Sequence, residues 1–350
     1  MKILIVRVGA MGDVLHALPA AAALKRARPD CQIDWVIDER WQPLLTNWDE
    51  SGPLITHSYA VPIRKWKAAP LGRETLASLG SFRKLRGQYD AVIDMQGTLR
   101  SALIGRLAGG RTLFGFADPR EKQAAWLYAR PLSRQGIHVV EQGTALLSQA
   151  LNLPLAVTQQ LDAAIQLPQI PWAEEWADRE AVLARPMAVL ASGGGWGAKR
   201  WPTTHYGALA LELRQRGYDV VVNAPHADAP EAAEVVASSE GAARTVVCNV
   251  AGLVALLRRA DLCIGGDSGP VHLAAALAVP TVALFGPTSP ERNGPWGPGP
   301  KAVLRDPASA TTYKRTAETE AGLARITPED VLAAIEQMGY GHGRNSATIL

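Results

Sequence analysis

Three glycine-containing turns hold the residues whose types and spacing could do chemistry. One of them, Gly265-Gly-Asp-Ser-Gly-Pro-Val-His272, lies between a short apolar run and an alanine-rich stretch. Ser268 is suited to cap the helix that follows and Pro270 to occupy its first turn, while the amides of a helix start attract anions. Asp267 would repel a phosphate, so we expect its carboxylate to face hydroxyl groups. The turn therefore suits a nucleotide sugar, and a plain strand–helix turn with its N-cap is the alternative.

The second turn is the run Ser192-Gly-Gly-Gly-Trp-Gly-Ala-Lys199, which follows the first apolar run of the C-terminal half. Bare glycine backbone can approach a diphosphate and donate its amides. Lys199 is the nearest point charge and is suited to neutralising phosphate oxygens. In the predicted topology this turn shares a sheet edge with the helix start at 267–269, so the two turns together predict a nucleotide diphosphate as the ligand.

The third turn, Gly9-Ala-Met-Gly12, leads into Asp13 and an alanine-rich helix. It lacks the G-x-G-x-x-G spacing of a dinucleotide site, and no Gly-Lys-Ser/Thr follows as in a P-loop. Asp13 lies where the first helix begins. It is either an N-cap, a common position for aspartate, or a carboxylate presented at the C-terminal edge of the sheet, where open α/β folds place their chemistry.

Two polar stretches interrupt the first half of the chain. Residues 62–67, Pro-Ile-Arg-Lys-Trp-Lys, carry three cations around a tryptophan, and residues 94–100, Asp-Met-Gln-Gly-Thr-Leu-Arg, join the end of a strand to a helix. Basic residues on loops are usually just solvated. The alternative is a patch that holds an anionic acceptor, helped by Arg83, Lys84 and Arg86.

Apolar runs and helical stretches alternate around these turns, as is typical of α/β proteins. The predicted strands are residues 3–8, 32–37, 59–62, 91–94 and 111–116 in the first half, and 187–191, 219–223, 244–248, 260–264 and 281–285 in the second. The predicted helices are 19–28, 75–86, 99–108, 139–151, 204–216, 231–238, 252–259 and 273–277. The pattern predicts a doubly wound parallel sheet in each half.

The chain length of 350 residues also favours two domains, because one core rarely grows past about 250–300 residues. An irregular stretch with prolines at 153–171 is typical of a linker. We therefore predict an N-terminal domain over 1–165, a C-terminal domain over 166–340 and a loose tail over 341–350.

Composition excludes several classes of protein. The net charge of +3 is too small to argue for nucleic acid. Cys31, Cys248 and Cys263 lie far apart without disulfide or metal-ligand spacing, as expected in a reducing compartment, and no Asp-x-Asp motif or histidine cluster calls for a metal. No apolar run reaches the length of about 18 residues that a membrane helix needs, and the N-terminal run is too short for a signal peptide. We expect a cytoplasmic protein.

Four motifs occur together and in a fixed order: Gly9-Ala-Met-Gly-Asp-Val-Leu-His16, Lys199-Arg-Trp-Pro202, Asp267-Ser-Gly-Pro-Val-His272 and Phe285-Gly-Pro-Thr-Ser-Pro290. With them the chain resembles the heptosyltransferases of glycosyltransferase family 9 from its start to about residue 340. The stretches 63–67 and 94–97 are more similar to the heptosyltransferase I group. The resemblance implies a GT-B fold, with two facing Rossmann-like domains and the active site in the cleft.

The same resemblance implies an inverting, metal-independent transfer from ADP-L-glycero-β-D-manno-heptose to the Kdo of Kdo-lipid A in the lipopolysaccharide inner core. ADP-heptose is then a substrate, and no cofactor is expected. The enzyme would work free in the cytoplasm or peripherally on the inner face of the inner membrane. Fixed amides and Lys199 could stabilise the charge that develops on the leaving phosphate.

Roles are carried over from the family position by position. Asp13 would be the general base, and the acceptor would be held by Arg64, Lys65, Lys67, Gln96 and Arg100. The donor would be held by Gly194, Gly195, Lys199, Asp228, Cys248, Asp267, Ser268, Gly269 and His272. Within that set Lys199 would bind the diphosphate and Asp267 the heptose hydroxyls, and His272 is alternatively a helix-packing histidine.

Two departures from the family pattern concern the donor. Family members often carry hydroxyl residues in the loop before Lys199, where this chain has glycines. The acidic residue that the family resemblance leads us to expect at the ribose aligns with Ala227, so Asp228 is a candidate substitute for it.

Other activities stay open at this point. They are heptosyltransferase II or another family 9 transferase, a nucleotide-sugar epimerase or hydrolase, and a non-enzymatic ADP-sugar-binding protein if Asp13 is only a cap. A dehydrogenase is disfavoured because neither half has the dinucleotide turn. Acceptor-dependent release of ADP separates these activities.

Overall fold

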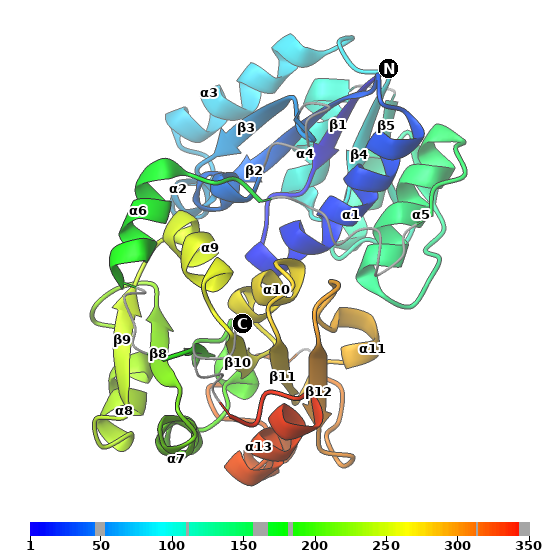
Figure 1. Cartoon of the computed structure of the whole chain (residues 1–350). Helices are drawn as coiled ribbons and strands as arrows, with labels where there is room; N and C mark the ends of the chain where they lie inside the picture. Colours follow the sequence, from blue (N-terminus) through cyan, green and yellow to red (C-terminus); the bar gives the residue numbers. More distant parts are fainter. Residues whose placement is uncertain (46–52, 110–111, 157–166, 181–184, 313, 343–350) are drawn as a thin grey trace. The chain divides into compact units, whose positions relative to one another are not determined.

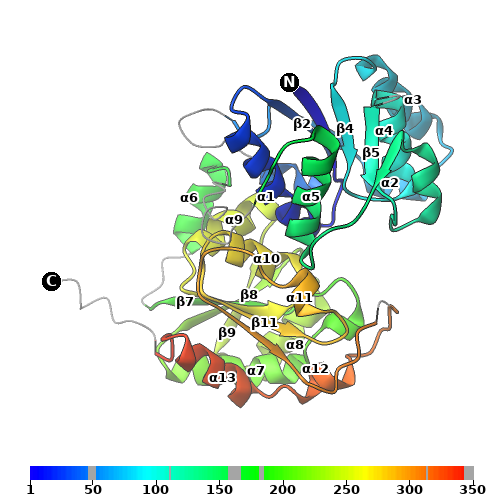
Figure 2. The same ribbon diagram turned by 90° about the vertical axis from the view of Figure 1, so that its right-hand side faces the viewer.

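The computed structural model describes residues 1–45, 53–109, 112–156, 167–180, 185–312 and 314–342 (Figures 1 and 2). The chain divides into two compact units, Met1–Pro168 and Gln169–Leu350. The predicted domain boundary at 165/166 lies outside the described residues, as do residues 343–350 of the predicted tail.

The N-terminal unit contains a six-stranded parallel sheet in the order β3-β2-β1-β4-β5-β6. Its strands are β1 (Lys2–Val6), β2 (Gln32–Asp38), β3 (His57–Val61), β4 (Ala91–Asp94), β5 (Leu113–Phe116) and β6 (Arg130–Leu132). β1 pairs with β2 on one side and with β4 on the other, so Ile3 lies beside both Ile33 and Ala91. The chain reverses its winding direction between β1 and β4.

Helices cover both faces of this sheet (Figures 1 and 2). α1 (Met11–Ala27) packs on α5 (Val139–Leu151) on one face, while α3 (Arg73–Ser81) and α4 (Leu99–Gly109) lie on the other. The short elements are α2 (Ile63–Ala68) and the 3₁₀ helices η1 (Glu39–Leu44), η2 (Phe82–Leu85) and η4 (Lys122–Leu127).

The C-terminal unit repeats this topology with a second six-stranded parallel sheet, ordered β12-β11-β10-β7-β8-β9. Its strands are β7 (Met187–Ala191), β8 (Asp219–Ala224), β9 (Ala243–Val247), β10 (Leu262–Gly266), β11 (Thr281–Phe285) and β12 (Lys301–Arg305). The winding reverses between β7 and β10. α/β sheets bind ligands outside the carboxyl ends of the strands at such reversal points.

The helices of this unit also form two layers (Figure 2). α7 (Thr203–Gln215), α8 (Pro230–Ser238) and α13 (Pro328–Gln337) cover one face, and α6 (Pro171–Glu180), α9 (Val250–Arg258) and α10 (Gly269–Ala276) cover the other. The short elements are η6 (Gly197–Lys199), α11 (Pro290–Asn293) and α12 (Ala321–Arg325). Because both sheets are covered on both faces, β1, β7 and β11 are mostly apolar, and all of their residues except Lys2 are buried.

The predicted doubly wound α/β class is confirmed, and the bounds predicted for β4, β7, β11 and α5 are those observed. Two local predictions were wrong. The first helix begins at Met11, close to Asp13 as expected, but the alanine-rich helix predicted over 19–28 is a continuation of it, and Pro19 lies inside α1. Residues 62–67 were expected to form a loop, but Ile63 and Trp66 are buried and the segment from Ile63 onward folds as α2. β6, β12, α6, α11, α12 and α13 were not predicted.

Candidate active site

A buried polar cluster surrounds the carboxylate of Asp267, between the end of β10 and the start of α10. Its Oδ1 lies 2.9 Å from Nε2 of His272, and its Oδ2 accepts a 2.7 Å hydrogen bond from Oγ1 of Thr288. Oδ2 also forms an ion pair with the ammonium group of Lys199. The side chains of Asp267 and Lys199 are 6% and 13% exposed, so both charges lie largely out of water.

Opposing effects act on the pKa of Asp267. Burial would raise this pKa, but the hydrogen bond and charge of His272, together with the charge and hydrogen bond of Lys199, hold it well below its ordinary value. Asp267 is therefore ionised at neutral pH. Both of its oxygens are already engaged, and Lys199 is oriented by Asp267. The roles expected for these residues, on heptose hydroxyls and on the diphosphate, remain predictions.

The backbone around Lys199 is fixed from two sides. The indole of Trp201 is buried and donates a 2.8 Å hydrogen bond to the carbonyl of Ile326, which anchors the Lys-Arg-Trp-Pro segment to the core. Gly266 allows β10 to pass close to it, because a Cβ at Gly266 would lie 2.5 Å from the carbonyl oxygen of Lys199. The sequence places glycine where only glycine fits.

The start of α10 has free capacity for a ligand. Ser268 occupies the N-cap position with extended backbone, and Pro270 lies in the first turn. The prediction that the Ser268 side chain caps the helix was wrong, because it makes no capping hydrogen bond. Its buried Oγ has no hydrogen-bond partner among the residues that the structure describes. The hydroxyl and the helix amides from Gly269 onward can therefore serve an anionic ligand.

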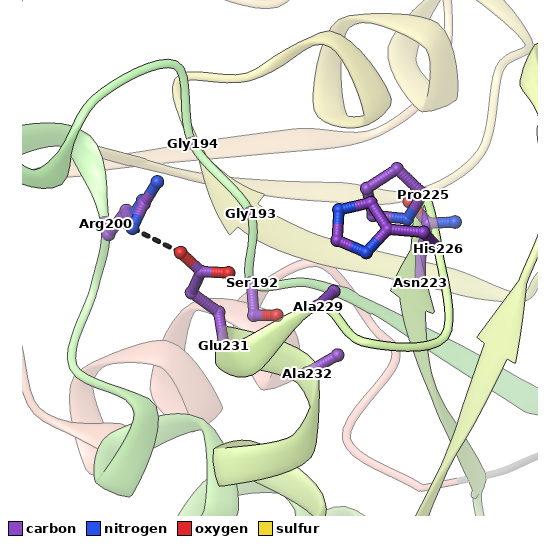
Figure 3. A pocket seen from close by; sticks show the side chains of 10 residues that line it. All are labelled: Ser192, Gly193, Gly194, Arg200, Asn223, Pro225, His226, Ala229, Glu231 and Ala232. Atoms are coloured by element: carbon purple, nitrogen blue, oxygen red, sulfur yellow. Dashed lines mark ion pairs between the residues drawn. The ribbon is translucent and has the colours of Figure 1, made fainter.

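A cavity of about 210 Å³ opens at the carboxyl ends of β7 and β8 (Figure 3). Its lining residues are Ser192, Gly193, Gly194, Arg200, Asn223, Pro225, His226, Ala229, Glu231 and Ala232. On one side Arg200 and Glu231 point toward each other and form an ion pair, and His226 lies on the other (Figure 3). Ser192 is buried, and its Oγ finds no hydrogen-bond partner within the described part of the chain.

The predicted donor residues differ in whether they line this cavity. Gly194 lines it, whereas Asp228 lies on the exposed turn between β8 and α8 and is not a lining residue. The acidic residue that the structure places in the cavity is Glu231. Cys248 follows β9, and its thiol accepts a 3.3 Å hydrogen bond from Nδ2 of Asn223, a lining residue. Burial raises the pKa of Cys248 to about 12, so its thiol is protonated and unreactive.

Asp13 lies at the third position of α1 in the N-terminal unit, and Ala10 is the N-cap. The interpretation of Asp13 as the N-cap was therefore wrong, because Asp13 lies three residues after the N-cap. Oδ2 of Asp13 accepts a 2.9 Å hydrogen bond from the amide of Ala10, and Oδ1 lies 2.8 Å from Nη2 of Arg7. The side chain is 40% exposed, so the carboxylate is both held in place and open to a proton donor.

The predicted acceptor residues fall into two groups. Arg64, Lys65 and Lys67 are exposed on α2, since Ile63 and Trp66 take the buried face of that helix. Gln96 follows β4 and contacts the loop before Asp13, and Arg100 is half-buried in the first turn of α4. Gln96 is thus placed by contacts within the protein, and the α2 cations are available to a ligand.

Sequence reasoning assigned no role to Thr288, Arg7 and Glu231. Thr288 belongs to the Phe-Gly-Pro-Thr-Ser-Pro motif. Its hydroxyl donates a hydrogen bond to Asp267, which explains physically why this motif contains a threonine. Arg7 follows β1 directly, and its position as a cation within the apolar run 3–8 was a signal that could have identified it. Glu231 lies in an ordinary helix start, and no pattern distinguished it.

The residues that the structure describes contain no group of three or more histidine, cysteine, aspartate or glutamate side chains that could hold a metal ion. Within the same residues, none of the helices has the length and apolar character needed to cross a membrane.

Comparison with known proteins gives consistent matches. The family described as glycosyltransferase family 9 (heptosyltransferase) matches residues 79–321. The Pseudomonas aeruginosa protein named lipopolysaccharide heptosyltransferase 1 is 33% identical over 328 residues, covering 90% of this chain and 87% of that protein.

Two solved structures agree with this result. Escherichia coli heptosyltransferase WaaC with ADP matches with a TM-score of 0.77 at 29% identity, covering 97% of this chain and 100% of that chain. The same enzyme with ADP-2-deoxy-2-fluoro heptose matches with a TM-score of 0.75 at 28% identity, covering 96% and 99%. The predicted GT-B fold is confirmed, and this protein belongs to glycosyltransferase family 9, the heptosyltransferases.

Proposed function

We propose that this enzyme transfers heptose from ADP-L-glycero-β-D-manno-heptose to the Kdo of Kdo-lipid A, with inversion at the anomeric carbon. The observation that supports this donor most directly is the buried Lys199–Asp267 pair beside the anion-attracting start of α10. The E. coli relative was solved with ADP and with a fluorinated ADP-heptose, which supports the same class of donor for this chain.

The proposed reaction is a single displacement. A hydroxyl oxygen of Kdo forms a bond to the anomeric carbon of heptose while the bond from that carbon to the diphosphate breaks. The hydroxyl proton passes to the carboxylate of Asp13, and ADP leaves with the bonding electron pair. The amides at the start of α10 and the ammonium of Lys199 would stabilise the charge on ADP, since fixed donors act where charge develops. General-base assistance of this kind is worth about 10²–10⁴ in rate.

The α2 cations support an anionic acceptor. Arg64, Lys65 and Lys67 are exposed, and Leu71, which follows α2 in the sequence, is 83% exposed. Cations next to an exposed apolar side chain suit the charged sugar and lipid of Kdo-lipid A, and they support peripheral association with an anionic membrane surface. Changing the three α2 cations to glutamine should raise the KM for the acceptor and lower flotation with anionic vesicles. An unchanged acceptor KM with a loss of ADP affinity would contradict this role.

The deciding experiment measures ADP release from ADP-heptose with and without acceptor. We expect release only when Kdo-lipid A is present, with one heptose added to Kdo. Release without any acceptor would instead indicate a hydrolase or an epimerase. Transfer only to an acceptor that already carries a heptose would indicate heptosyltransferase II activity.

A further inference from the structure

The amide oxygen of the Gln96 side chain is occupied by the protein itself. Its Oε1 accepts hydrogen bonds from the amides of Val8, at 3.0 Å, and Gly9, at 3.1 Å. Both amides belong to the loop over residues 7–10, which joins β1 to α1, the helix that carries Asp13 in its first turn. A carbonyl oxygen has two lone pairs, so this oxygen is fully used by the loop. Gln96 was expected to bind the acceptor, but its contacts point to a different task.

Arg7 makes a second connection between the same two loops. Its Nη2 lies 2.8 Å from Oδ1 of Asp13, and its Nε donates a 3.3 Å hydrogen bond to the carbonyl of Asp13. Its Nη1 donates to the carbonyl of Met95 in the loop after β4. One planar guanidinium, 15% exposed, thus holds the carboxylate and backbone of Asp13 against the residue before Gln96.

The loop after β4 is itself firmly anchored. Oδ1 of the fully buried Asp94 accepts hydrogen bonds from the amides of Gln96, at 2.9 Å, and Gly97, at 3.1 Å. Its Oδ2 accepts from the hydroxyls of Ser101, at 3.0 Å, and Tyr128, at 2.9 Å. The backbone of Gln96 is therefore fixed by a buried carboxylate with four donors. A fixed loop can impose its position on a neighbouring loop.

The steric limit on the other side of the Asp13 loop comes from Trp41. A Cβ at Gly9 would lie 2.7 Å from Nε1 of this indole, so the loop passes directly against it. Gln96 and Arg7 hold the loop from the β4 side, and Trp41 closes it from the β2 side. The loop that leads into the first turn of α1, and so to Asp13, has little room to move.

We propose that Gln96 and Arg7 are positioning residues, which transmit the rigidity of the Asp94-anchored loop to the carboxylate of Asp13. This inference rests on the proposed role of Asp13 as general base. Neither residue needs to touch a substrate. Catalysis is sensitive to such placement, because a misplacement of about 1 Å in a reacting group can lower the rate about 100-fold.

The test uses two substitutions of Gln96 in the full-length protein. Gln96→Met keeps the length of the side chain and removes the acceptor oxygen. Gln96→Glu keeps an acceptor for both amides. We expect Gln96→Met to lower kcat about 10- to 100-fold with the KM values of donor and acceptor nearly unchanged. Gln96→Glu should recover at least about a third of the wild-type kcat, and hydrogen exchange at Val8 and Gly9 should be faster only in Gln96→Met.

A double-mutant cycle with Asp13→Asn separates the explanations. If Gln96 acts through Asp13, Gln96→Met should change the residual kcat of Asp13→Asn by less than about twofold. A raised acceptor KM in both backgrounds would show that Gln96 binds the acceptor and would overturn the inference. Wild-type turnover in Asp13→Asn alone would overturn the assignment of the base, and the inference with it. An equal loss of kcat in both backgrounds would overturn the positioning role only.

Discussion

The ion pair between Lys199 and Asp267 joins donor binding to stability, and substitution of Lys199 by methionine tests both. Methionine keeps the apolar stem and removes the charge. It leaves Asp267 ionised and 6% exposed, with His272 and Thr288 as its remaining side-chain partners among the described residues. Breaking a buried pair from one side lowers the free energy of unfolding by about 3–5 kcal/mol. We expect a loss of that size in guanidinium unfolding.

The same substitution should weaken the binding of ADP. A charged hydrogen bond contributes about 1.5–3 kcal/mol, which corresponds to about 10- to 150-fold in Kd. Titration calorimetry with ADP measures this loss. The double variant Lys199→Met/Asp267→Asn removes both charges, so it should regain most of the lost stability and none of the lost affinity.

A matched control is the exposed pair between Arg214 and Asp219, in which the arginine is 45% exposed. Arg214→Met should change the free energy of unfolding by about 1 kcal/mol or less and leave ADP binding unaltered. Wild-type ADP affinity in Lys199→Met would refute the reasoning, because Lys199 would then serve only as the structural partner of Asp267.

Three further predictions follow from the geometry of the two units. Glu231→Gln should lower the affinity for ADP more than that for 2′-deoxy-ADP, whereas Asp228→Asn should leave both Kd values unchanged, because only Glu231 lines the cavity; the reverse result would restore the ribose role to Asp228. Since the pKa of Asp267 is depressed in the folded protein, its contribution to stability is present above the unfolded pKa of about 3.9 and is lost as the pH falls toward the folded pKa. Acid titration of the unfolding free energy should therefore show the gap between wild type and Asp267→Asn closing below about pH 4, and a constant gap would contradict this. Gly9→Ala should lower kcat more than about tenfold because the new Cβ would collide with Trp41, and full activity would show that the loop can move.

Local sequence patterns determined most of the fold. Buried parallel strands are continuous apolar runs, so the positions of β1, β4, β7 and β11 could be predicted without knowledge of their neighbours. The turns after β1, β7 and β10 were also found from sequence, because glycines followed by a charged residue at a strand end are distinctive. Weaker signals failed: β6 has three residues and β12 is only partly buried, so neither has a clear apolar pattern.

Tertiary structure decided which atoms these residues use. Lys199 and Asp267 are 68 residues apart in sequence, and their ion pair exists because β7 and β10 are neighbours in the sheet. The sequence predicted Asp228 as a donor residue, but Glu231 is the carboxylate that lines the cavity. The direction in which the start of α8 faces decides this, since a shift of a few residues in a turn moves a carboxylate from the cavity to solvent.

Gln96 shows the same division most clearly. Its sequence position, two residues after β4, predicted a side chain at the functional edge of the sheet. Its bonds to Val8 and Gly9 arise because β1 and β4 are adjacent at the point where the winding reverses. Local periodicity in the sequence specifies which residues lie at that edge of the sheet. The pairing of strands distant in the chain sets whether each of them meets a ligand or another loop.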